Sequence, residues 1–207
     1  MVRGKTRRYL SGVSAALAGV ALFGMSACYE AVPEVTVVQP APPGTAVVVP
    51  AETHLSTSNA AALVLAANNA TIQRADIARS RASNAQVRSF AERVYLESQA
   101  ADAALQALIA DFDITPQADE TSNRVSTIAA RTVSYMQSAR GLEVDRIFLE
   151  AQSANDRWLV GTLNAIIPTL PDVGARDDLE FVRNALTARL MEAERLHEMV
   201  IQRGARG

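Results

Sequence analysis

The positions of the prolines limit where this chain can form long helices. Five of its eight prolines lie between Pro33 and Pro50, one stands alone at Pro116, and the last two are Pro168 and Pro171. Proline fixes φ and lacks the backbone N–H that a helix interior needs, so a long helix can run only between prolines. The sequence after Pro50 therefore has room for a helical domain, and the segment between Pro33 and Pro50 does not.

Apolar residues in the proline-free stretches recur at intervals of three and four, which is the spacing of one face of a helix. The chain is 49% hydrophobic but only 5% aromatic, and it is rich in alanine, which favours helices over sheets. No sustained strand pattern follows the proline-rich segment. The predicted helices span about 58–81, 84–112, 121–166 and 172–203.

From these helices we expect an all-α fold, an antiparallel four-helix bundle formed by residues 57–203. Asn84 is a favourable N-cap for the second helix, and Pro116 follows its end. Gly141 interrupts the apolar pattern of the third helix, so we expect that helix to be broken or bent near Gly141. Gly204 follows the fourth helix as a stop signal.

The N-terminus has the parts of a secretory signal peptide. Four basic residues lie within the first eight, and no charged residue occurs from residue 10 to residue 27. A basic start, an apolar stretch and a small-residue end are the order of such a signal. Residues 1–27 are therefore predicted to be a lipoprotein signal peptide. Two alternatives are an ordinary cleaved signal and an uncleaved membrane anchor, because 18 uncharged residues stand at the lower limit of a span.

The apolar stretch ends in Met25-Ser26-Ala27-Cys28. This run resembles the bacterial lipobox, although leucine is usual where Met25 stands. The resemblance implies that lipid is attached to Cys28, the only cysteine of the chain. Several acyl chains, at about 0.8 kcal/mol per buried CH₂, would hold the protein on a membrane. Tyr29 rather than aspartate follows the cysteine, which favours an outer-membrane lipoprotein with its body in the periplasm.

Residues 28–56 are predicted to be a Pro-rich tether in a semi-extended form, with the alternative that part of it docks on the helical domain as a strand. Removing residues 1–27, which carry four basic residues, leaves 16 basic and 22 acidic residues and a net charge of −6. A chain with this charge is a poor candidate for binding nucleic acid. The partners we expect are a membrane, through the lipid anchor, and an unknown protein of the cell envelope.

Three segments of the predicted helices resemble a known family. They are residues 77–94, Gly141–Leu149, and Arg189–Leu190 ahead of Ala193. In order and spacing these segments are similar to the domain of unknown function 4142, a ferritin-like family of exported bacterial proteins, and the similarity covers about residues 58–202. The resemblance implies a ferritin-like fold and an exported location. It implies no reaction, because the biochemical function of the family is not established.

The chain departs from this family at its polar positions. The family usually has Asp-His where this chain has Glu97 and Ser98, and a histidine at each of the positions of Asp156 and Arg189. Opposite charges thus replace two histidines, so we hypothesise that Asp156 and Arg189 form a buried or half-buried ion pair. The alternative is two independent charges on the surface.

Glu194 and His197 form the sharpest motif for chemistry. Ferritin-like di-iron sites use Glu-x-x-His on two helices, with one further glutamate from each of the other two. Here the motif occurs once, and the other histidine is His54 in the predicted tether; Glu97 and Glu150 could add carboxylates. We expect a solvated pair beside the helix seam and no metal. The alternative is a metal site with Glu194 and His197 as its first ligands.

The sequence contains no motif that indicates an enzyme. It lacks a glycine-rich phosphate loop, a Gly-x-Ser-x-Gly elbow and any defensible triad of Ser, His and Asp. We therefore predict a non-enzymatic interaction or structural module in the envelope, with no cofactor other than the covalent lipid at Cys28. The alternative is a ferritin-like protein that binds or stores metal.

Overall fold

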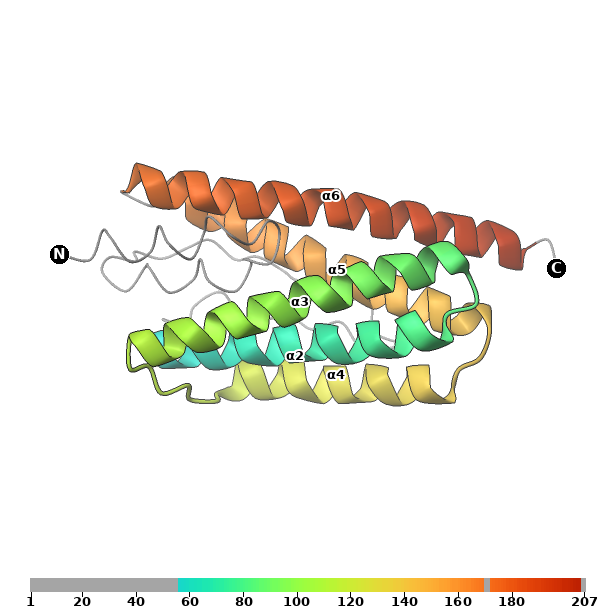
Figure 1. Ribbon diagram of the computed structural model, residues 1–207, viewed down its shortest axis with the longest axis horizontal. Helices are drawn as coiled ribbons and strands as arrows, with labels where there is room; N and C mark the ends of the chain where they lie inside the picture. The colour runs from blue at the N-terminus through green and yellow to red at the C-terminus, as the bar shows by residue number, and fades with distance from the viewer. Residues whose placement is uncertain (1–55, 170–171, 206–207) are drawn as a thin grey trace.

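The computed structural model describes residues 56–169 and 172–205, and every regular element within these ranges is helical (Figure 1). The all-α class that the apolar spacing predicts is thus confirmed for them. The predicted signal peptide, Cys28, His54 and nearly all of the predicted tether lie outside the described residues. The elements are α2 (Thr57–Arg81), α3 (Ala85–Asp111), α4 (Glu120–Ser138), α5 (Leu142–Ile166), the short 3₁₀ helix η2 (Ile167–Thr169) and α6 (Val173–Gly204).

Among the helices described, none combines the length and the apolar character that a membrane span requires.

Three helices begin at side chains that accept a hydrogen bond from the first turn. Ser56 caps α2 through the N–H three residues on, at 3.1 Å, and Asn84 caps α3, as predicted, through the N–H two residues on, at 2.8 Å. Asp119 and Ser122 form a reciprocal capping box at the start of α4. A cap of this kind contributes about 1 kcal/mol, so these residues define where the helices start.

The break predicted near Gly141 is present. The segment expected as one interrupted helix is two helices, α4 and α5, and the chain reverses direction between them (Figure 1). Gly141 has φ 59° and ψ −135°, a conformation that residues with a Cβ avoid. The described residues therefore hold five α-helices instead of four. The apolar spacing continues on both sides of the glycine, and spacing alone does not distinguish a bend from a reversal.

The turns at this end are held by side chains that bind backbone groups. Arg81, at the end of α2, donates to the carbonyl oxygens of the last residues of α4 and its cap, at 2.7–3.1 Å. Asp145 of α5 is fully buried; its carboxylate accepts from the N–H and hydroxyl of Ser83, both at 2.7 Å, and from the N–H of Asn84 at 3.0 Å. These bonds fix the α2–α3 turn against α5 and satisfy donors at the start of α3.

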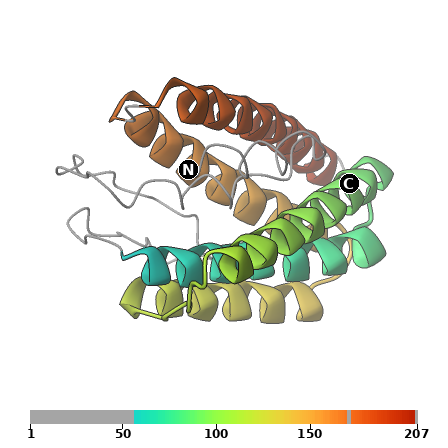
Figure 2. The same cartoon turned by 60° about the vertical axis from the view of Figure 1, so that its left-hand side comes forward.

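The helices form two groups. α2 packs against α3 and α4, and α5 packs against α6. The two groups lie one above the other, and they diverge toward the end where α2 begins (Figures 1 and 2). Phe90 of α3 and Phe148 of α5 meet between them, with ring centroids 6.0 Å apart.

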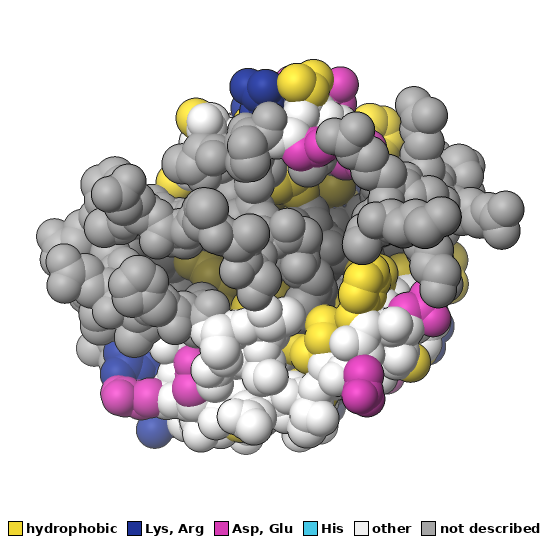
Figure 3. Space-filling model, turned by 90° about the vertical axis from the view of Figure 1, so that its left-hand side faces the viewer, with side chains coloured by type: hydrophobic (Ala, Val, Ile, Leu, Met, Phe, Trp, Pro, Cys, Tyr) yellow, Lys and Arg dark blue, Asp and Glu magenta, His cyan; other side chains and the backbone are white. Residues whose placement is uncertain are grey.

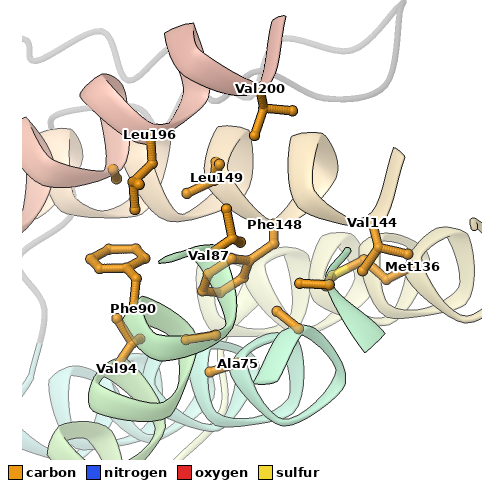
Figure 4. Packing of buried hydrophobic residues seen from close by; sticks show 14 residues of the cluster. Ala75, Val87, Phe90, Val94, Met136, Val144, Phe148, Leu149, Leu196 and Val200 are labelled. Carbon is orange, nitrogen blue, oxygen red and sulfur yellow. The ribbon is translucent and has the colours of Figure 1, made fainter. Parts of the chain in front are cut away.

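Two apolar clusters join the groups. The larger cluster takes buried side chains from all five α-helices, and Figure 4 shows Leu196, Leu149, Val87 and Phe90 facing one another between α3, α5 and α6. It contains Ala75, Ala78, Ala82, Val87, Phe90, Ala91, Val94, Met136, Val144, Phe148, Leu149, Ala193, Leu196 and Val200. The smaller cluster links α3, α5, η2 and α6 and contains Leu108, Leu163, Ile167, Leu179, Val182 and Leu186.

The end of the domain at which α2 begins shows apolar side chains among polar ones. In that view, neutral side chains and backbone cover most of the lower part of the described surface, with acidic and arginine side chains scattered around them (Figure 3). Phe112, after α3, and Val173, at the start of α6, are large apolar side chains that are 49% and 60% exposed. Scattered exposure of this kind is ordinary for a folded surface.

Candidate functional site

A network of charged side chains lies in the middle of the domain, where α5 and α6 pack together. Asp156 is fully buried in α5. Arg189 of α6 donates from Nε to Oδ2 of Asp156 at 2.9 Å and from Nη2 to Oδ1 at 2.6 Å. Gln152, one turn earlier in α5, donates to Oδ1 at 3.0 Å. The structure thus joins the two residues of the hypothesised pair by a bidentate contact, which is the strong geometry for an arginine and a carboxylate.

Glu97 of α3 extends this network toward solvent. Its Oε2 lies 3.6 Å from Nη1 of Arg189, and its side chain is 32% exposed. Burial by itself lowers the pKa of Arg189, but the attraction of Asp156, with that of Glu97, outweighs burial and raises that pKa. Arg189 therefore stays charged, and it links α3 to the α5–α6 pair.

The neighbouring Ser98 is also buried, and its carbonyl oxygen accepts from the side chain of Asn68 in α2 at 2.9 Å. Residues 97, 98, 156 and 189 are the positions at which the resemblance puts the acidic residue and the histidines of relatives. The structure brings three of them, Glu97, Asp156 and Arg189, together from α3, α5 and α6.

Arg74 of α2 belongs to the same region, and the sequence analysis did not single it out. It is 2% exposed, and burial lowers its pKa to about 10, against the opposing attraction of Asp156. Its Nη2 donates to the Thr71 hydroxyl at 3.3 Å, while Nε is buried without a partner. One sequence feature could have indicated its burial. Arg74 lies four residues from both Ala70 and Ala78, on the face of α2 that carries small residues.

The pair of Glu194 and His197 lies elsewhere on the α5–α6 seam. Glu194 accepts a hydrogen bond from Arg157 Nη2 at 2.5 Å. His197 Nε2 lies 3.3 Å from Glu150 Oε1, but the geometry does not make a hydrogen bond and Nε2 is without a partner. Glu150 already accepts from Arg146 Nη1 at 2.7 Å. The structure thus places His197 beside Glu150 and occupies Glu194 with an arginine.

Within residues 56–169 and 172–205, no group of three or more His, Cys, Asp or Glu side chains is arranged to hold a metal ion. The two buried carboxylates have other partners, since Asp145 binds the α2–α3 turn and Asp156 binds Arg189. The residues of the central network pair opposite charges across helices. Its residues can fix the positions of α3, α5 and α6 relative to one another.

Comparison with protein families gives a match over most of the chain. The family model of a domain of unknown function, DUF4142, matches residues 43–196. The chain belongs to the DUF4142 family. The match begins within the predicted tether and includes Glu97, Asp156 and Arg189. Comparisons with curated proteins and with solved structures found no match. The family brings no activity with it, so function has to be argued from the residues of this chain.

Proposed function

We propose that this DUF4142 protein is a lipid-anchored protein of the bacterial envelope, exported and held on the outer membrane with its helical domain in the periplasm. The observation that carries this proposal is the run Met25-Ser26-Ala27-Cys28, which follows a basic start and an uncharged stretch. The sole cysteine of the chain occupies the position that lipidation requires. Residues 28–56 then act as a tether between the lipid and the domain that begins at α2.

Lipidation is tested by expressing the full chain in a Gram-negative host fed with labelled palmitate. The wild-type chain should carry the label, lose residues 1–27 and sediment with the outer membrane. Cys28→Ala should carry no label, because no other thiol exists in the chain. Ser26→Ala, which keeps a small residue before the cysteine, is the matched control and should remain labelled. An unlabelled wild-type chain that is released into the soluble periplasm would contradict the proposal.

For the domain itself we propose a non-enzymatic role as an interaction or structural module. This proposal is supported by the contacts of the central polar residues. Arg189 pairs with both Asp156 and Glu97 and thereby joins three helices. A polar network committed in this way specifies the packing of a core. The domain then serves as a rigid body that the lipid holds near the membrane, where it meets a protein of the envelope.

A ferritin-like metal protein is the second proposal. The helices α2, α3, α5 and α6 would form its four-helix core, with α4 added against α2. The observation that favours it is the approach of His197 to Glu150, one turn from Glu194. Two arginines compete for these carboxylates, which is why we rank the metal role below the interaction module.

Metal content separates the two roles. The full chain, prepared without a histidine tag, is loaded anaerobically with Fe(II), Mn(II) or Zn(II), desalted, and its metal counted by mass spectrometry. We expect well below one metal ion per chain, because arginines already bind the carboxylates of Glu150 and Glu194. Glu194→Ala with His197→Ala is the control. A stoichiometric metal that disappears in this double variant would overturn the ranking and favour storage or redox chemistry.

A further inference from the structure

The guanidinium of Arg74 is buried without an adequate acceptor. In the described part of the molecule its one hydrogen bond is the 3.3 Å contact from Nη2 to the Thr71 hydroxyl, and that hydroxyl itself donates to a backbone carbonyl. Nε has no partner. A buried cation without acceptors is costly, so a side chain of this kind indicates that something else contacts it.

The nearby carboxylates do not fill this role. Asp156 attracts Arg74, but its oxygens accept three hydrogen bonds from Arg189 and Gln152. Glu97 faces Arg189 and is about one-third exposed, so water screens its charge. The most deeply buried charges of the network are therefore two arginines against one aspartate, and an acceptor is missing on the side of Arg74.

One turn before Asp156, α5 carries a buried acceptor and a buried hydroxyl without partners. Oε1 of Gln152 and the hydroxyl of Ser153 are both buried and make no hydrogen bond. Gln152 is held by its bond to Asp156, and a serine hydroxyl rotates to suit an acceptor. Oε1 is itself an acceptor and does not bind an anion, so the group of this region that lacks an acceptor is the Arg74 guanidinium on α2. Helical bundles build ligand sites between facing helices.

We propose that a small monovalent anion, chloride or a small carboxylate such as acetate, binds in the core at the Arg74 guanidinium, between α2 and α5. The anion accepts a hydrogen bond from Nε of Arg74, the buried donor that has no partner. It balances the second buried arginine and links the α2–α3–α4 group to the α5–α6 pair. This site is independent of the lipid anchor and of the interaction role proposed above.

The test is the thermal unfolding of the full chain in detergent, in sodium chloride, sodium acetate or sodium gluconate at equal ionic strength. Gluconate is too large for a packed core and serves as the reference. At an anion concentration about ten times its dissociation constant, the ratio of folded to unfolded protein rises about tenfold. For a chain of this size the Tm should then rise by about 3–6 °C over gluconate.

Two variants assign the effect to the buried arginine. Arg74→Met keeps a long side chain and removes the charge, and it should abolish the difference between salts. Arg79→Met is the matched control on the same helix; Arg79 pairs with Asp76 on the surface, so this variant should keep the full difference. Stabilisation by chloride alone identifies a halide site, and stabilisation by acetate identifies a carboxylate site. Equal Tm values in the three salts, or an unchanged difference in Arg74→Met, would overturn the proposal.

A direct measurement keeps the proposal testable if Arg74→Met fails to fold, as circular dichroism would show. The unmodified chain is crystallised with the stabilising anion, and bromide replaces chloride where chloride is that anion. Density for the anion, or an anomalous peak for bromide, should appear within hydrogen-bonding distance of Arg74 Nε. A core without such density under stabilising conditions would refute the site.

Discussion

At the scale of single residues, the centre of this DUF4142 domain depends on charged groups that have lost their contact with water. Asp156 is fully buried, and Arg189 is 14% exposed at its side chain. A buried pair of this kind adds little net stability compared with apolar residues, because both ions lose hydration. Removing one member is different, since it leaves the other ion buried without a partner. The network therefore acts more through the geometry that it enforces than through net stabilisation.

We expect Asp156→Ala and Arg189→Ala each to lower the free energy of unfolding by about 3–5 kcal/mol. The double variant should lose clearly less than the sum, because neither ion is then left unpaired. Urea unfolding of the four proteins measures this coupling. The exposed pair of Arg157 and Glu194 is the control, with an expected coupling of about 0–1 kcal/mol. Additive losses, together with no recovery in the swap of Asp156→Arg with Arg189→Asp, would refute a specific pair.

At the scale of elements, the turn at Gly141 decides how α4 and α5 are related. The positive φ at this residue lets the chain leave the axis of α4 and return along α5. The bonds of Arg81 to the end of α4, and of Asp145 to the α2–α3 turn, then hold the reversal against the rest of the domain. A local backbone conformation and a few buried side chains thus set the number of helices.

Gly141→Ala should destabilise the domain by about 1–2 kcal/mol through backbone strain alone. A Cβ at this position would meet no atom within 4 Å, so no steric clash adds to the loss. Gly204→Ala is the control, because Gly204 has no positive φ and an added Cβ makes only ordinary contact with Leu142. Its change should stay within about 0.5 kcal/mol. Denaturant midpoints measure both, and equal values for the two variants would contradict the strain argument.

At the scale of the whole molecule, two groups of helices share one core. The larger apolar cluster takes residues from all five α-helices, and the contacts of Arg189 cross from α6 to α3 as well as to α5. The groups should therefore unfold together, since neither can bury its apolar face without the other. The central position of Phe148 makes it the residue at which this shared core is most directly tested.

Phe148→Ala should lower the free energy of unfolding by about 3–5 kcal/mol, the usual loss for a large buried aromatic side chain. Phe148 is 0% exposed and packs on Phe90 across the two groups. Phe181→Ala, at a position that is 54% exposed, is the control and should change stability by less than about 1 kcal/mol. Calorimetry should show one transition in each protein. Two separate transitions would mean that the groups are independent folding units.

The sequence by itself determined the helical class, the approximate helix ends and the Asn84 cap, because proline positions and apolar spacing act through local backbone physics. It also supplied the family and the idea of an Asp156–Arg189 contact, because both come from residues in a recognisable order. The lipid anchor at Cys28 and the absence of a bound metal stay predictions, which palmitate labelling and metal content test.

Only the tertiary structure decided that the chain turns back at Gly141 and that Arg74 is buried. The reversal depends on how α4 packs on α2 and α5 on α6, which involves residues far apart in the chain. An arginine in an alanine-rich helix is expected to be exposed, because its charge is strongly hydrated. No local pattern in the sequence marks Arg74 as an exception. Its burial follows from the packing of the helices around the middle of α2, and packing is a property of the whole chain.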